Sequence, residues 1–165
     1  MQGRWLLLGI AGWLSACAGA AVPPPVEPEP EKPGNCSPKP ELQATAIKKP
    51  DGVICSDREA LVEMVASCNK KDALSCYKVG VCHTTNALVF ARDPAKRAKT
   101  IAQAQKALRI ACDGGVAEGC MVRAGLFEEQ RNVPAQKKAA CADAIRACHL
   151  GHKIGCADCV MCGAD

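Results

Sequence analysis

Cysteine supplies most of the chemistry available to this chain, which has 165 residues and 13 cysteines. Six of the cysteines form three pairs whose members are separated by seven residues: Cys68/Cys76, Cys112/Cys120 and Cys148/Cys156. Thiols in pairs can form disulfides, bind a soft metal ion or exchange electrons. If the chain is exported, cysteines at this density indicate disulfides. Each such bridge closes a loop of about nine residues and stabilises an unstrained fold by roughly 2 to 3 kcal/mol.

A metal site is the alternative near the C-terminus. Two histidines and three cysteines that zinc could bind fall close together there: His149, His152, Cys156, Cys159 and Cys162. However, Cys156 belongs to a repeated pair, and an oxidising compartment consumes free thiols. We therefore expect disulfides, with no metal and no other cofactor. Both histidines are expected to be turn and surface residues.

Ser75 and Lys78 are the only residues that suggest hydrolysis. They match the Ser-x-x-Lys string of serine β-lactamases, but the chain lacks the Ser-Asp-Asn and Lys-Thr-Gly partners of that motif. Ser75 also precedes Cys76, so a small residue at a tight helix contact is the simpler interpretation. We expect no catalytic residue and no enzyme activity.

Antiparallel helices would position the paired cysteines. Each pair spans the end of one helix-like stretch, a turn and the start of the next stretch, and the pairs recur at intervals of 44 and 36 residues. This period predicts an all-α fold, a short α-solenoid of about three disulfide-stapled hairpins that follows a disordered linker. The six helices are expected from Ser56 (N-cap, with Glu59) through Cys68, Ala73 to His83, Asp93-Pro94 to Cys112, about Val116 to Glu128, Asn132-Val133-Pro134 to near Cys148, and Lys153 to Cys162.

The longer first interval adds four residues to each arm, which is about one helical turn. Both helices between the first two pairs would then be longer by a turn, with Ala87-Leu88-Val89-Phe90 packing in the extension. A longer loop at Thr84-Thr85-Asn86 explains the same interval, and the sequence leaves both explanations open.

Facing residues of antiparallel helices have a constant index sum. This sum is 304 for Cys148 with Cys156 and 303 for Cys141 with Cys162, so a second bridge is expected at Cys141/Cys162. The sequence leaves the pairing of four further cysteines open, and Cys55 can reach Cys82 only if the chain before Ser56 folds back. The four are Cys36, Cys55, Cys82 and Cys159.

The N-terminus has the features of an export signal. Residues 1–16 place a base before an apolar run too short to span a bilayer, which predicts a signal peptide. The segment Leu14-Ser15-Ala16-Cys17 resembles the bacterial lipobox. This resemblance implies acylation of Cys17, with palmitate as a typical chain, and stable membrane attachment. An ordinary secretory signal cleaved near Cys17 is the alternative. Ala18 after the cysteine favours the outer membrane, so we expect a lipoprotein of the cell envelope that faces the periplasm or the cell surface.

The next segment differs in composition from the rest. Residues 17–54 contain nine of the 11 prolines, between Pro23 and Pro50, and predict a disordered linker. Residues 55–165 are then expected to form one helical repeat domain. Arg4 is the only charged residue among residues 1–16, so removal of this segment lowers the formal charge from +4 to +3. That charge gives no basic stripe for nucleic acid.

The repeated junctions resemble a known family. The segments Ala111-Cys112-Asp113-Gly114-Gly115-Val116-Ala117-Glu118-Gly119-Cys120 and Ala147-Cys148-His149-Leu150-Gly151-His152-Lys153-Ile154-Gly155-Cys156 are similar to the junction of cysteine-rich Sel-one-like repeat proteins, relatives of the tetratricopeptide repeats. The resemblance covers about residues 57–165. The glycine-rich loop usual between the helices of a repeat is missing at Cys82 to Asp93 and at Glu129 to Val133.

The family resemblance implies a scaffold or adaptor that binds proteins or peptides. Some secreted members are described as penicillin-binding proteins or weak β-lactamases. We therefore expect a monomeric, membrane-anchored, exported scaffold that binds a partner protein or peptide and no nucleic acid. A weak hydrolase acting on β-lactam or peptidoglycan and a purely structural envelope lipoprotein are the alternatives.

Overall fold

The computed structural model describes residues 36–48, 52–128 and 133–162. Within these residues the chain is helical and contains no strand, which confirms the all-α class. The helices are α1 (Pro40–Gln43), α2 (Arg58–Asn69), α3 (Ala73–Thr85), the π-helix η1 (Asn86–Phe90), α4 (Pro94–Asp113), α5 (Ala117–Glu128), α6 (Pro134–His149) and α7 (Lys153–Cys162).

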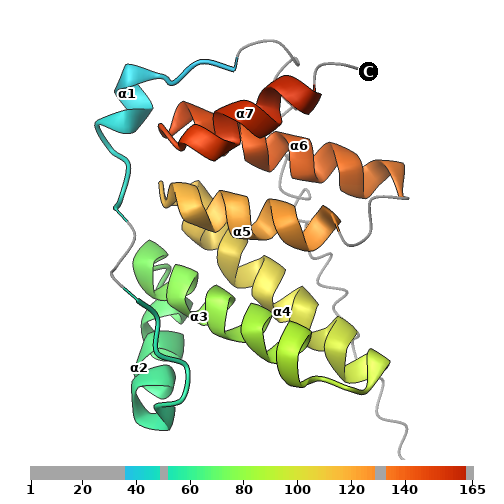
Figure 1. Cartoon of the computed structure of the whole chain (residues 1–165). Helices are drawn as coiled ribbons and strands as arrows, with labels where there is room; N and C mark the ends of the chain where they lie inside the picture. Colours follow the sequence, from blue (N-terminus) through green and yellow to red (C-terminus); the bar gives the residue numbers. More distant parts are fainter. Residues whose placement is uncertain (1–35, 49–51, 129–132, 163–165) are drawn as a thin grey trace, which may run out of the picture.

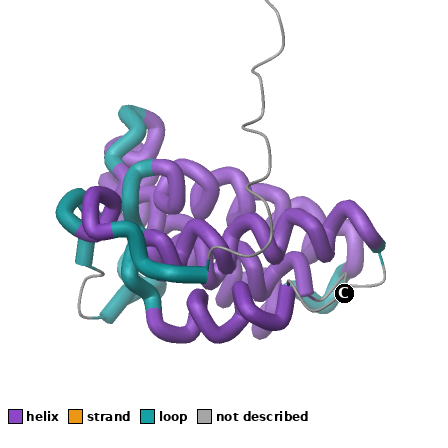
Figure 2. The backbone as a smooth tube through the Cα atoms, turned by 90° about the horizontal axis from the view of Figure 1, so that it is seen from above, coloured by secondary structure: helices purple, strands orange, loops and turns teal. Residues whose placement is uncertain are grey.

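Three hairpins make up the body of the molecule: α2 with α3, α4 with α5, and α6 with α7. Each of these helices packs against its neighbours in sequence, so the second helix of one hairpin also covers the first helix of the next. The hairpins follow one another along the molecule (Figure 1), and in the view from above their helices overlap (Figure 2).

The turns inside the three hairpins have one conformation. Each places a residue in the left-handed region, with φ of 69° at Lys71, 93° at Gly115 and 89° at Gly151. The next N–H donates to the carbonyl five residues earlier, as Val116 does to Ala111 at 2.9 Å. This is the Schellman arrangement that ends helices. Its repetition brings the paired cysteines together in the same way three times.

The helix starts agree with the sequence in part. Asp93 accepts hydrogen bonds from the N–H groups of Ala95 and Lys96, and Pro94 follows it, as predicted for α4. The prediction that Ser56 caps α2 is wrong. The cap is Asp57, whose carboxylate accepts the Ala60 N–H at 3.0 Å. An aspartate caps as well as a serine does and adds a favourable charge at the positive end of the helix.

Helical turns account for the longer first interval. Helix α4 has 20 residues and α6 has 16, and α3 runs through Thr84 and Thr85 into η1. The loop explanation is therefore wrong. The packing expected of the extension is only partly right, because Ala87 is fully buried while Val89 and Phe90 are 66% and 69% exposed.

The core consists of small residues in close contact. Leu108 of α4 is completely buried against α3 at Gly80. A Cβ atom added to Gly80 would lie 2.5 Å from Cγ of Leu108. Helices can approach this closely only where one of them has a very small side chain.

The prediction that residues 17–54 form a disordered linker is wrong for residues 36–48. Residues 36–48, which we call the strap, lie along the turns of the second and third hairpins (Figure 1). The Lys39 N–H donates to the carbonyl of His149 at 3.1 Å, and the Ile47 N–H donates to that of Gly115 at 3.0 Å. Carbonyls at helix ends lack partners within the helix, so they can hold a segment that has few apolar residues.

Two further contacts fix the strap. Cys36 is bonded to Cys159 of α7, and Leu42 and Ala46 pack against the apolar cluster of the second and third hairpins. The local composition predicted disorder, but a distant cysteine and two apolar side chains hold the segment in place. Residues 1–35, which include the expected signal peptide and Cys17, lie outside the described residues.

Candidate functional site

The cysteines form six disulfides among the described residues. The structure joins the three repeated pairs, Cys68–Cys76, Cys112–Cys120 and Cys148–Cys156, with Cα separations of 4.5, 4.7 and 4.4 Å, and also joins Cys141 to Cys162 at 5.6 Å. The four cysteines without an expected partner form Cys36–Cys159 and Cys55–Cys82. The chain before α2 therefore folds back onto α3, which was the condition for the second of these bonds.

The candidate metal ligands do not converge. Cys156, Cys159 and Cys162 are each bonded to a different cysteine, and the described residues contain no group of three or more metal-binding side chains that could hold an ion. His149 is 1% exposed, which corrects the expectation that it lies on the surface. Nδ1 of His152 accepts the Gly155 N–H at 3.2 Å. His152 thus accepts a hydrogen bond from the first turn of α7.

Ser75 is engaged in a helix cap. Its hydroxyl and its backbone N–H both donate to the carboxylate of Asp72, the N–H at 2.7 Å, and these hydrogen bonds hold the pKa of Asp72 below its usual value. A nucleophilic serine needs a base that takes its proton. Here the hydroxyl proton is directed to a carboxylate whose affinity for protons is lowered, so the arrangement favours the structural interpretation of Ser75.

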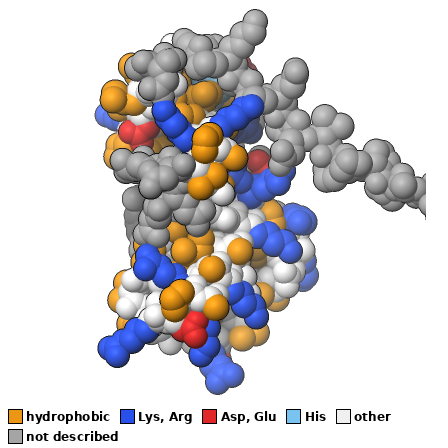
Figure 3. Space-filling view, turned by 90° about the vertical axis from the view of Figure 1, so that its right-hand side faces the viewer, with side chains coloured by type: hydrophobic (Ala, Val, Ile, Leu, Met, Phe, Trp, Pro, Cys, Tyr) orange, Lys and Arg blue, Asp and Glu red, His pale blue; other side chains and the backbone are white. Residues whose placement is uncertain are grey.

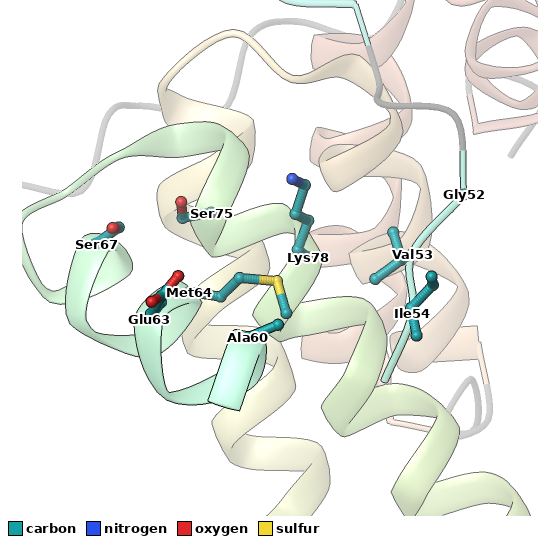
Figure 4. A pocket seen from close by; sticks show the side chains of 9 residues that line it. All are labelled: Gly52, Val53, Ile54, Ala60, Glu63, Met64, Ser67, Ser75 and Lys78. Carbon is teal, nitrogen blue, oxygen red and sulfur yellow. The ribbon is translucent and has the colours of Figure 1, made fainter. Parts of the chain in front are cut away.

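Ser75 and Lys78 nevertheless line a groove at the first hairpin. The groove has a volume of about 420 Å³ and is open to solvent. One wall is the segment 52–54, which precedes Cys55, and the other lining residues come from α2 and α3 (Figure 4). The lining residues are Gly52, Val53, Ile54, Ala60, Glu63, Met64, Ser67, Ser75 and Lys78. The groove thus combines apolar, hydroxyl and charged side chains.

The floor of this groove is a surface that the other hairpins bury. Adding the repeat intervals of 44 and 36 residues to Met64 gives Leu108 and Ala144, which are 0% and 3% exposed. The same offsets take Ser67 to two alanines that are both fully buried, Ala111 and Ala147. Met64 and Ser67 are only half-buried. The groove is therefore the uncovered first face of the repeated hairpins.

A buried ion pair lies on the equivalent face of the third hairpin. Nε of Arg123 donates to Oδ2 of Asp143 at 2.7 Å, and Nη2 donates to Oδ1 of the same carboxylate. Asp143 is 2% exposed, and its burial raises its pKa even though the hydrogen bonds and charge of Arg123 act in the opposite direction. The pair joins α5 to α6.

The sequence analysis missed both the groove and this pair. A signal for the pair was present, because Asp143 is four residues before the buried Ala147 and thus shares its helix face. An acid at an apolar position of the helical period needs a partner. The groove had no such signal, since it arises from the order of the hairpins.

Basic side chains are dispersed on the visible surface. Figure 3 shows a face on which lysine and arginine side chains lie scattered among apolar ones. In the described part of the chain, no helix has both the length and the apolar character needed to cross a membrane.

The chain matches no protein-family model, and no curated protein or solved structure is detectably similar to it.

Proposed function

We propose that the protein is an exported, lipid-anchored helical-repeat scaffold that binds a partner protein or peptide in the bacterial cell envelope. The observation that carries this proposal is the open groove on α2 and α3, whose floor corresponds to surfaces that helices cover elsewhere in the molecule. A partly apolar groove held by bridged helices is suited to binding a peptide or helix.

The disulfides support the exported location. Six bridges within the described residues require an oxidising compartment to form and persist. The resemblance of the segment around Cys17 to a lipobox adds the lipid anchor. If that interpretation is right, palmitate labelling and detergent-phase partitioning will be lost in a Cys17→Ser variant, and their retention would contradict it.

Site-specific photo-crosslinking tests the scaffold function. A photoreactive residue at Ser67, on the floor of the groove, should yield a discrete crosslinked band in intact cells. The same residue at Gln103, which is exposed on α4, should not. In isolated envelopes, an excess of the protein without the photoreactive residue should compete for the partner and weaken the crosslinked band obtained at Ser67. Equal crosslinking at both positions, or none at either, would favour a structural envelope protein instead.

A further inference from the structure

The two internal contacts between hairpins follow one rule. Helix α3 covers α4 with Gly80 against Leu108. Helix α5 covers α6, and Ala124 is its residue at the position equivalent to Gly80 after 44 residues. Ala124 is 7% exposed, and the residue before it is Arg123, which binds Asp143. Each covering helix thus has a small residue at this position, Gly80 in α3 and Ala124 in α5. In α5, the basic residue Arg123 directly precedes the small one.

Among the described helices, none covers α2 as α3 covers α4, but α2 has the matching acceptor. Subtracting the two intervals from Asp143 gives Glu63, which lines the groove next to Met64. Glu63 is exposed, and no hydrogen bond or ion pair to its side chain is present in the part of the chain described. The uncovered face therefore carries an unpaired carboxylate where the third hairpin uses its carboxylate to bind an arginine.

We propose, resting on the scaffold function above, that the groove receives an α-helix of a partner protein in which an arginine directly precedes a glycine or alanine. The partner helix lies on α2 as α5 lies on α6. Its small residue faces Met64, whose flexible side chain can adapt to the contact, and its arginine binds Glu63. Lys78 at the groove edge favours an acidic residue on the same partner helix.

A second copy of this chain does not fit the groove. The exposed end of the third hairpin is α7, and adding 36 residues to Arg123 gives Cys159. Cys159 is 1% exposed and bonded to Cys36 of the strap, so α7 presents no base at the required position. The geometry therefore points to a different chain.

The helix α5 supplies a probe of defined sequence. We would label a synthetic peptide of residues 116–131, with Cys120→Ser to prevent disulfide exchange, and titrate it with the exported chain carrying Cys17→Ser and intact bridges. Fluorescence anisotropy should give saturable binding. Glu63→Gln in the protein, or Arg123→Gln in the peptide, should each weaken binding about tenfold, and the two changes together should weaken it no further.

Asp158→Asn provides the matched control, because Asp158 is an exposed carboxylate on α7 and should leave binding unchanged. Ser67→Trp, which fills the groove, should abolish binding. The proposal fails if the peptide does not bind at about 1 mM, or if Asp158→Asn weakens binding as much as Glu63→Gln does. It also fails if crosslinking of the envelope partner persists unchanged in Glu63→Gln, and in that case the scaffold function stands. If the peptide binds but crosslinking at Ser67 yields no partner, the scaffold function is refuted, while the preference of the groove for such a helix still stands.

Discussion

Replacement of Arg123 by methionine removes the partner of a nearly inaccessible carboxylate. Asp143 is 2% exposed and receives two hydrogen bonds from the guanidinium, one of them at 2.7 Å. Breaking a buried ion pair from one side typically costs about 3 to 5 kcal/mol, because the remaining charge is left without compensation. A domain of this size has a total stability of about 5 to 15 kcal/mol. A loss of 3 kcal/mol would lower the unfolding midpoint by roughly 12 to 24 °C.

The same variant should depend on pH in a definite direction. Burial raises the pKa of Asp143 in the folded state, and removal of Arg123 takes away the group that most strongly opposes this shift. Below the unfolded pKa, about 3.9, both states are protonated and the electrostatic cost disappears. As the pH rises through the folded pKa, the unfolded state gives up its proton first, so stability is lost. Arg123→Met should therefore cost far more at about pH 7 than at about pH 4.

Urea denaturation under non-reducing conditions, followed by circular dichroism, measures these costs. The control is Arg109→Gln, because Arg109 and Asp113 are 3.8 Å apart on the surface, with side chains 53% and 68% exposed. This change should cost less than about 0.5 kcal/mol. The double variant Arg123→Met with Asp143→Leu should recover to within about 1 kcal/mol of the parent. A cost below about 1 kcal/mol for Arg123→Met, or one that does not change with pH, would refute the reasoning.

Two further pairs of substitutions test the turns and the helix contacts by the same assay. Lys71→Gly should stabilise the fold by about 0.5 to 1 kcal/mol, because the left-handed φ of 69° at this position is strained for a residue with a side chain and unstrained for glycine. Lys70 has a φ of −84°, so Lys70→Gly should not stabilise the fold. Equal effects of Lys70→Gly and Lys71→Gly would contradict the explanation. Gly80→Ala should destabilise by about 1 to 3 kcal/mol through its clash with Leu108. Gly125→Ala, whose Cβ would meet nothing within 4 Å, should stabilise by up to about 1 kcal/mol, and a neutral Gly80→Ala would show that the contact is looser.

Local signals predicted the helices. Asp93 and Pro94 define the start of α4 through interactions within four residues, so the sequence alone was sufficient. Cys141 could be paired with Cys162 because regular antiparallel helices keep their register from one bridge to the next. The capping error at α2 has a local cause too, since Ser56 and Asp57 are adjacent and equally able to cap.

Distant contacts could not be predicted in this way. The strap follows proline-rich sequence, and its order depends on Cys36 finding Cys159, which is 123 residues away. Its backbone hydrogen bonds reach carbonyls at turns whose positions depend on the whole stack of hairpins. Residues 36–48 therefore needed the fold before their own structure could be inferred.

The disulfides explain how the first hairpin can keep one face uncovered. In repeat proteins a terminal unit loses the burial that a neighbour would provide, and it usually needs a cap. The last hairpin has one in the strap and the Cys36–Cys159 bond. The first hairpin instead has two bonds to α3, Cys68–Cys76 from α2 and Cys55–Cys82 from the segment before it. Covalent bonds of this kind hold the two walls of the groove in place, which under the proposed scaffold function would reduce the entropy lost when a partner binds.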